Sequence, residues 1–238
     1  MKGIDLYLKI TNIIHRCKEM SEIENKNFKK FQEVMKVKDE YDLPPHISYN
    51  DYQSLLNTID NEEYHHYLNK KLVPFLKARD KLLVMMMWEL GGRVSDIISI
   101  QTKDIDFSKK EIVLIVKKRH GYINRIPVSD SLLLEVSNFL RMLNINSGSI
   151  FFKMDNQNKD PITRQRAWEI VSRYGNKIGL KLHPHMFRHG LAIYLLQYGV
   201  DAKIIARRLG HSSAATTLKY YLVITPEVER DALRGILL

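Results

Sequence analysis

The sequence of 238 residues predicts a mainly α-helical protein with one small antiparallel β-sheet (α+β). Through most of the chain, apolar residues recur at helical spacing with charged residues between them, as in amphipathic helices. The pattern changes at residues 111–118, which are rich in Ile and Val and predict a strand. Residues 119–121 predict a turn, and residues 122–128 predict the returning strand, whose proline suits a sheet edge.

The helices are taken in order along the chain. The paired prolines Pro44 and Pro45 cannot continue a helix, so a boundary is expected there, between residues 1–43 and residues 44–238. Ser48 followed by Asp51 predicts the start of the next helix. The predicted helical ranges are 4–40, 48–58, 74–90 (ended by Gly91 and Gly92), 94–100, 130–144, 161–178, 184–199, 201–209, 212–221 and 226–237.

Charge is distributed unevenly along the chain. The net charge is +10 and the isoelectric point about 9.5. Residues 1–43 hold 9 Lys and Arg against 8 Asp and Glu, whereas residues 44–238 hold 28 against 19. A basic domain often binds a polyanion, and the alternative is a basic surface that only aids solubility. A polyanion-binding surface is therefore expected mostly in residues 44–238.

Cysteine usage and hydropathy bear on the compartment. The lone Cys17 can form neither an internal disulfide nor a cysteine-based zinc site, which favours an intracellular protein, cytoplasmic or nucleoid-associated. The most apolar stretch, residues 82–88, is too short to span a bilayer and predicts a buried helix.

Four residues in the last quarter of the chain form the most informative pattern. His185 and Arg188 form a His-x-x-Arg pair at the start of a predicted helix. Further on, His211 is followed nine residues later by Tyr220. Arginine and histidine can neutralise a phosphate and share its protons, and tyrosine can attack it and hold it covalently. On a basic protein, this set predicts phosphoryl transfer on nucleic acid without a metal.

A second arginine, Arg93, lies upstream in the sequence Gly-Arg-Val-Ser-Asp that ends at Asp96. This box, the His-Met-Phe-Arg-His stretch from residue 185 and the Leu-Gly-His segment followed by Tyr220 occur in the order seen in tyrosine recombinases. The chain from about residue 44 to residue 238 therefore resembles the catalytic domain of this phage-type integrase family, in its Xer-like form. The resemblance implies the tyrosine recombinase catalytic-domain fold.

The resemblance also implies roles. Arg93 and Arg188 would bind the scissile phosphate through their planar guanidinium donors. His185 would share protons at that phosphate, and His211 would donate to a non-bridging oxygen. Asp96 would orient the arginine and the nearby histidine. His189 is interpreted as structural.

The predicted hairpin contains the lysine that, in this family, protonates the leaving 5′ oxygen. Lys117 and Lys118 are both candidates. Val113 and Ile115 precede Lys118 at the apolar spacing common before the family's lysine, which favours Lys118. Lys117 remains the alternative.

The nucleophile is also one of two neighbours, Tyr220 and Tyr221. The family's spacing from His211 selects Tyr220, and on a helix Tyr221 would point about 100° away. Tyr221 is expected to be a packing aromatic.

The function implied is site-specific DNA recombination or integration through a 3′-phosphotyrosyl intermediate, without cofactor or metal. The alternatives are a non-catalytic DNA-binding protein that keeps the fold, relaxation of DNA as by a type IB topoisomerase, and a metal-dependent nuclease. The implied partner is double-stranded DNA, bound by a homotetramer on paired sites, with an accessory DNA-binding protein as a further partner. Residues 1–43 are interpreted as a short helical segment, a reduced core-binding or arm region, and residues 226–237 as a helix that docks on a neighbouring subunit.

Overall fold

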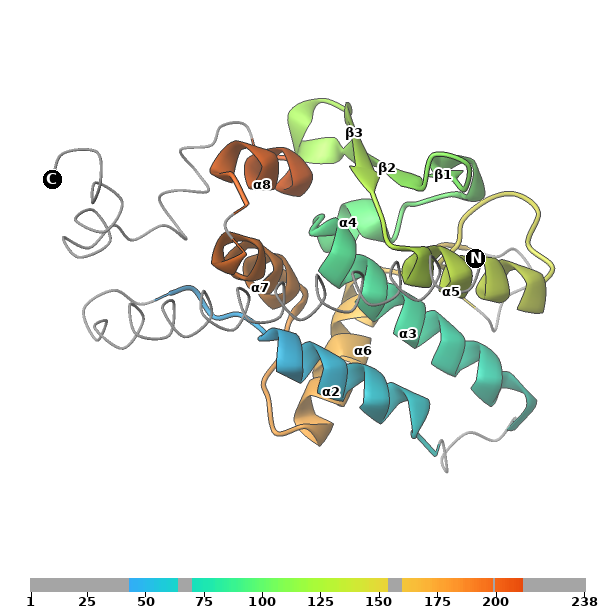
Figure 1. Cartoon of the computed structure of the whole chain (residues 1–238). Coiled ribbons are helices and arrows are strands. Elements are labelled where there is room, and N and C mark those ends of the chain that lie inside the picture. Colours follow the sequence, from blue (N-terminus) through green and yellow to red (C-terminus); the bar gives the residue numbers. More distant parts are fainter. Residues whose placement is uncertain (1–42, 64–69, 154–159, 199, 212–238) are drawn as a thin grey trace, which may run out of the picture.

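The computed structural model describes residues 43–63, 70–153, 160–198 and 200–211. The helices predicted at 4–40, 212–221 and 226–237 lie outside the described residues. Within them the chain is mainly helical with one small sheet, as predicted (Figure 1). The elements are α2 (Tyr49–Asp60), η1 (Lys70–Leu72), α3 (Val73–Leu90), α4 (Val94–Ile97), η2 (Thr102–Asp104), β1 (Ile105–Asp106), β2 (Glu111–Val116), η3 (Lys117–Arg119), β3 (Tyr122–Pro127), α5 (Asp130–Met142), α6 (Arg164–Lys177), α7 (Pro184–Gln197) and α8 (Ala202–Leu209).

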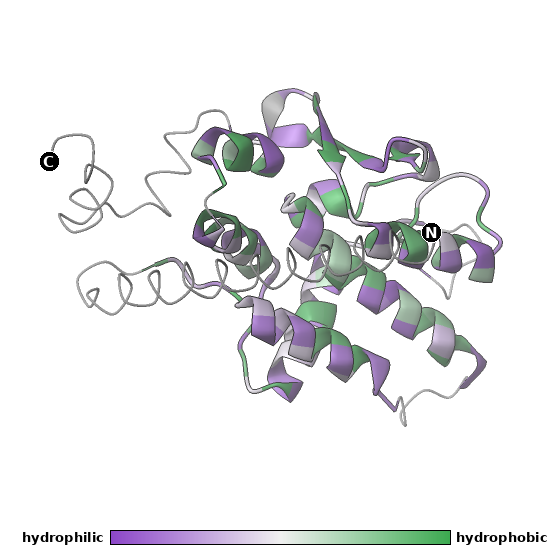
Figure 2. Cartoon of the chain, viewed as in Figure 1, coloured by the Kyte–Doolittle hydropathy of each residue, from purple (hydrophilic) through white to green (hydrophobic). Residues whose placement is uncertain are grey.

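Helix α3 lies at the centre of the fold and packs on α2, α5, α6 and α7. The apolar run predicted to be buried, residues 82–88, is buried on all sides of the helix. The surrounding helices are amphipathic instead. Figure 2 shows hydrophilic and hydrophobic residues alternating along α2, which turns Tyr52, Leu55 and Ile59 into the core.

The sheet has the strand order β1-β2-β3, with both pairings antiparallel. The predicted hairpin is present, but β2 ends at Val116, before the predicted Lys118. The three basic residues after Val116 form the 3-10 turn η3, and the alternation of buried and exposed side chains ends with the strand. The turn closes through His120 and Gly121, both at positive φ. Strand β1 was not predicted, since two residues are too few to show a period.

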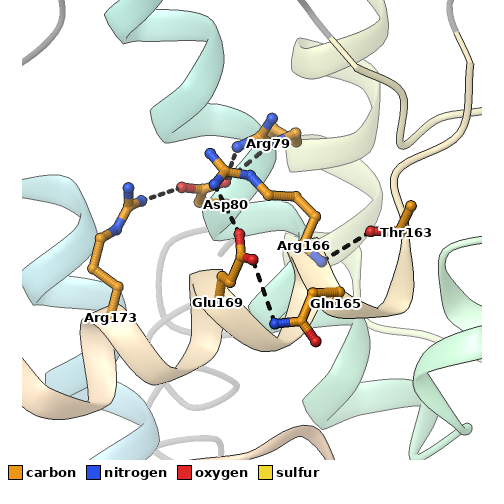
Figure 3. Close-up of polar contacts among 7 residues, drawn as sticks. All are labelled: Arg79, Asp80, Thr163, Gln165, Arg166, Glu169 and Arg173. Carbon is orange, nitrogen blue, oxygen red and sulfur yellow. Dashed lines mark hydrogen bonds and ion pairs between the residues drawn. The ribbon is translucent and has the colours of Figure 1, made fainter.

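A buried ionic cluster fastens α3 to α6 (Figure 3). Asp80 is fully buried, and its carboxylate accepts hydrogen bonds from Arg79 Nη2 and Arg173 Nη2, both at 2.7 Å. Tyr174 Oη also donates to it at 3.2 Å. The opposite charges and the hydroxyl together satisfy a carboxylate that would otherwise be costly to bury.

Candidate active site

The turn between α3 and α4 places Arg93. Gly91 ends α3 in the left-handed conformation at φ 58°, and an added Cβ would lie 2.6 Å from Leu191 Cδ2 and 2.7 Å from Leu209 Cδ2. A residue with a side chain would therefore be strained, and the side chains of Leu191 on α7 and Leu209 on α8 would have to move. Arg93 follows as the N-cap of α4, half-buried. Helix α4 ends at Ile97, three residues before the predicted end.

Arg188 joins three elements at one point. Its side chain is buried, and Nη1 donates to Gly91 O at 2.8 Å and also to Leu209 O. The arginine on α7 therefore holds the C-terminal ends of both α3 and α8. A guanidinium fixed in this way is preorganised, so little of its orientation must be set when an anion arrives.

His211 follows the end of α8. Gly210 ends the helix in the left-handed conformation at φ 67°, and His211 N donates to Ala206 O at 2.8 Å. Partial burial, and then the positive charges of Arg188 and Arg93, lower the pKa of His211 to about 4. The imidazole therefore lies near both predicted phosphate-binding arginines and is neutral at pH 7.

His185 stands exposed in the first turn of α7. Its pKa is lowered, first by partial burial and then by the positive charge of Arg188, with His183, Arg93 and Lys118 adding to the effect. The pKa of His189 is lowered to about 4 by burial and by the neighbouring His185, whose ring centroid lies 6.3 Å away. Both rings therefore lie close to positively charged side chains, Arg188 among them.

The hairpin turn adds the lysines. Lys117 and Lys118 are both exposed in η3, and Lys118 is the hairpin lysine whose charge lowers the pKa of His185. Asp96 is buried on α4, and its Oδ1 accepts from Ser95 Oγ at 3.4 Å and from Lys117 N at 3.5 Å. The carboxylate thus contacts the start of the hairpin turn. Its predicted role of orienting an arginine stays a prediction.

Five of the six predicted catalytic residues therefore come together from α4, η3, α7 and the end of α8. They are Arg93, Lys118, His185, Arg188 and His211. Tyr220 and Tyr221 lie outside the described residues. In Figure 1 the hairpin and α8 lie beside each other at the top of the molecule, with α4 and α7 beneath them.

Sequence reasoning missed several residues around this cluster. A pocket of about 720 Å³ opens beside His185 between α4, the start of α6 and the start of α7, and Trp168 lines it with 46% of its surface exposed.

Two contacts that hold α8 were also missed. Arg208 on α8 donates twice to Glu89 O, at 2.9 and 2.6 Å, and so connects α8 to α3. Asn124 on β3 donates to the end of α8. An amphipathic pattern shows which helix faces are buried, but it does not show which polar side chain meets a distant backbone carbonyl.

The part of the chain that the structure describes contains no group of three or more His, Cys, Asp or Glu side chains placed to hold a metal ion. It also contains no helix that is both long and apolar enough to cross a membrane.

Comparison with known proteins bears on the family and the fold. Residues 46–227 match the Phage integrase family. Since the match spans most of the chain, this protein belongs to the phage integrase family. The resemblance to tyrosine recombinases that the motifs indicated is thereby confirmed.

Curated relatives include two archaeal proteins named tyrosine recombinase XerA. The chain is 33% identical to the one from Pyrococcus furiosus over 168 residues, which are 71% of this chain and 58% of the relative. It is 36% identical to the one from Pyrococcus horikoshii over 166 residues, 69% of this chain and 57% of the relative. The chain therefore spans less than two thirds of the length of these relatives.

Solved structures with the same fold include XerH site-specific recombinase bound to its difH substrate, in a pre-cleavage complex. That structure matches with a TM-score of 0.64 and 23% identity, over 81% of this chain and 55% of that chain. A crystal structure of XerA recombinase matches with a TM-score of 0.62 and 18% identity, over 84% of this chain and 65% of that chain. These likenesses confirm the predicted tyrosine recombinase catalytic-domain fold.

Proposed function

We propose that this protein is a tyrosine site-specific recombinase, which cleaves and rejoins DNA strands through a 3′-phosphotyrosyl intermediate. The observation that carries the proposal is the convergence of Arg93, Arg188 and Lys118 with two histidines of lowered pKa. Burial first, and then the positive charges of the arginines and the lysine, lower the pKa of these imidazoles. Cationic side chains gathered in this way can bind an anion. A DNA phosphate is the anion that the family and the basic charge favour.

Each step of the cleavage has a residue to carry it. The phenolic oxygen of Tyr220 attacks the phosphorus, and the bond from phosphorus to the 5′ oxygen breaks. The phenolic proton passes to a neighbouring base or to the phosphate, and His185 is the imidazole proposed to share protons there. Lys118 gives a proton to the leaving 5′ oxygen. Arg93, Arg188 and the N–H of His211 stabilise charge on the non-bridging oxygens.

Rejoining reverses these steps. The 5′ hydroxyl of a partner strand attacks the phosphotyrosyl bond and releases Tyr220, so the energy of the broken phosphodiester is retained and no nucleotide cofactor is consumed. Exchange between two duplexes requires paired active sites, and we include in the proposal a homotetramer on two DNA sites. The names of the XerA relatives, tyrosine recombinases, and the complex of the site-specific recombinase XerH with its difH substrate support DNA as the partner.

The proposal extends to the parts that the structure does not describe. Residues 1–43 are proposed to form a reduced arm or core-binding segment, and residues 44–238 the catalytic domain. Residues 226–237 are proposed to dock on the next subunit. An accessory DNA-binding protein is proposed as a further partner. The place of action would be the cytoplasm or the nucleoid, where the DNA lies.

A nicked suicide substrate tests the proposal. Duplex DNA carries a nick just beyond the scissile phosphate, so the short 5′-hydroxyl strand diffuses away after cleavage and the adduct accumulates. Because the target site is unknown, a library of random central sequences is used and adducts are selected on denaturing gels. The expected result is a covalent adduct, formed equally in excess EDTA.

Other outcomes would select other functions. Cleavage that depends strictly on magnesium would indicate a metal-dependent nuclease. Relaxation of supercoiled plasmid of any sequence, without strand exchange, would indicate topoisomerase activity. Tight DNA binding with no adduct on any member of the library would indicate a DNA-binding protein that only keeps the fold.

A further inference from the structure

The last carbonyls of α8 are held from several directions. Ala206 O accepts from His211 N, and Arg207 O accepts from Gly210 N at 2.9 Å. Leu209 O accepts from Arg188 Nη1. The end of a helix leaves such carbonyls without intrahelical donors, so each contact helps to fix the segment that leads into His211.

A further donor comes from the sheet. Asn124 Nδ2 on β3 donates to Arg207 O at 2.8 Å and to Arg208 O at 3.1 Å. The side chain is 2% exposed, on the inward-facing side of a strand where the neighbouring inward residue is Ile126. A buried amide in place of an apolar residue lowers stability unless its hydrogen bonds are made. Here one nitrogen satisfies two carbonyls of a helix end.

Asn124 also belongs to the hairpin that carries Lys118. It pairs with Leu114 across β2 and β3, and the same two strands lead into and out of η3. The hydrogen bonds of Asn124 therefore join two segments that carry different predicted catalytic groups. A shift of the hairpin relative to α8 would break them.

We infer that Asn124 is a positioning residue, which fixes the end of α8, and with it His211, against the hairpin that carries Lys118. The inference rests on the proposed function for its catalytic consequence. Asn124 itself acts through backbone carbonyls, and its effect on cleavage must pass through His211.

A double-mutant cycle tests this route. Asn124→Leu removes the donors while keeping a similar volume and no charge. Asn61→Leu is the control, because Asn61 Nδ2 also donates to a carbonyl at a helix end. That carbonyl is Asn57 O of α2, at 2.9 Å. In the wild-type background, Asn124→Leu is expected to slow adduct formation about tenfold or more. In the His211→Ala background, the same substitution is expected to slow it by less than about twofold. Equal slowing in both backgrounds would overturn the inference, since a merely structural loss acts on both alike.

A second measurement does not need activity. The ring of His211 is titrated by NMR in the free protein, where Arg188, Arg93 and His189 face it and its pKa is about 4. Release of the end of α8 should let water reach the ring, so Asn124→Leu is expected to raise this pKa by one unit or more, while Asn61→Leu leaves it unchanged. An unchanged pKa in Asn124→Leu would overturn the inference.

The two arms separate the inference from the function it rests on. If the wild-type chain forms no adduct on any substrate, the proposed function fails, and the titration still decides whether Asn124 positions His211. If Asn124→Leu does not fold, Asn124→Ala takes its place in the cycle. It removes the donors without adding charge or bulk, and the same loss of effect in the His211→Ala background is expected.

Discussion

At the scale of single residues, the site is defined by positive charge gathered from separate elements. Arg188 combines two tasks, because it faces the cluster and also binds the carbonyls of Gly91 and Leu209. Arg93 lies at the N-cap of α4, half-buried. The two arginines should therefore behave differently when removed, although both are proposed to bind the same phosphate.

Arg93→Ala and Arg188→Ala are each expected to slow adduct formation on the order of a hundredfold, as for a lost preorganised donor to developing charge. Only Arg188→Ala should also lower the free energy of unfolding clearly, by about 1–3 kcal/mol, because buried carbonyls lose their donor. Single-turnover cleavage and urea denaturation measure the two effects. Near wild-type cleavage by either variant would remove that arginine from the site.

The lowered pKa values of His189 and His211 predict a pH dependence of stability. Both values are about 4 in the folded chain, against 6.5 for an ordinary histidine. As the pH falls from about 6.5 toward 4, the unfolded chain binds protons that the folded chain does not, so stability present at pH 7 is lost on acidification. The melting temperature should therefore fall between pH 7 and 5, and less steeply in His211→Gln. The same slope in that variant would contradict a lowered pKa at His211.

The choice between the two hairpin lysines has its own test. Lys118→Ala should slow cleavage of ordinary DNA, and DNA with a 5′-bridging phosphorothiolate should restore the rate, because sulfur leaves without needing a proton. Lys117→Ala is the matched control, since both lysines are exposed in the same turn. Rescue of Lys117→Ala instead would move the role by one residue.

At the scale of elements, local sequence signals predicted the helices well but predicted the sheet only in part. Ser48 caps α2 through Asp51 N, and Gly91 ends α3, both as the sequence indicated. The turn that carries Lys118 begins two residues earlier than predicted, and β1 was missed. The start of the turn and the presence of β1 both depend on where backbone groups pair between strands. A local sequence pattern does not contain this information.

The same limit applies to the site. The motifs predicted the residues that come together, because the resemblance supplied their grouping. The contacts that hold them were not predictable: Asn124 meets carbonyls 83 and 84 residues away in sequence, and Arg208 meets one 119 residues away. Asp80 is a similar case, with its partner Arg173 on another helix.

The buried cluster around Asp80 is expected to stabilise the packing of α3 on α6, and a substitution at Asp80 tests this. Asp80→Asn should lower the free energy of unfolding by about 3–5 kcal/mol, because it leaves Arg79 buried without its counter-charge. Asp130→Asn is the control, since the ion pair of Asp130 with Lys110 is exposed and should contribute about 1 kcal/mol or less. Urea denaturation of both variants measures the difference. Equal stabilities would show that the cluster adds little to the fold.

At the scale of the whole molecule, a central buried helix positions a cluster assembled from four separate segments. Most of the net positive charge belongs to residues 44–238, the part that contains this cluster. The family and the fold are those of the phage integrases, and Tyr220 is the proposed nucleophile of the cluster. The account therefore depends most on Tyr220.

The most direct measurement is adduct formation on the nicked suicide substrate by the wild-type chain, Tyr220→Phe and Tyr221→Phe, followed by peptide mapping of the DNA-linked residue. Each substitution removes one oxygen and should leave DNA binding nearly unchanged. The account predicts that Tyr220→Phe abolishes the adduct, that Tyr221→Phe retains it, and that the DNA is linked to Tyr220. An adduct that persists in Tyr220→Phe would contradict the assignment, and one that is lost only in Tyr221→Phe would transfer the role to Tyr221.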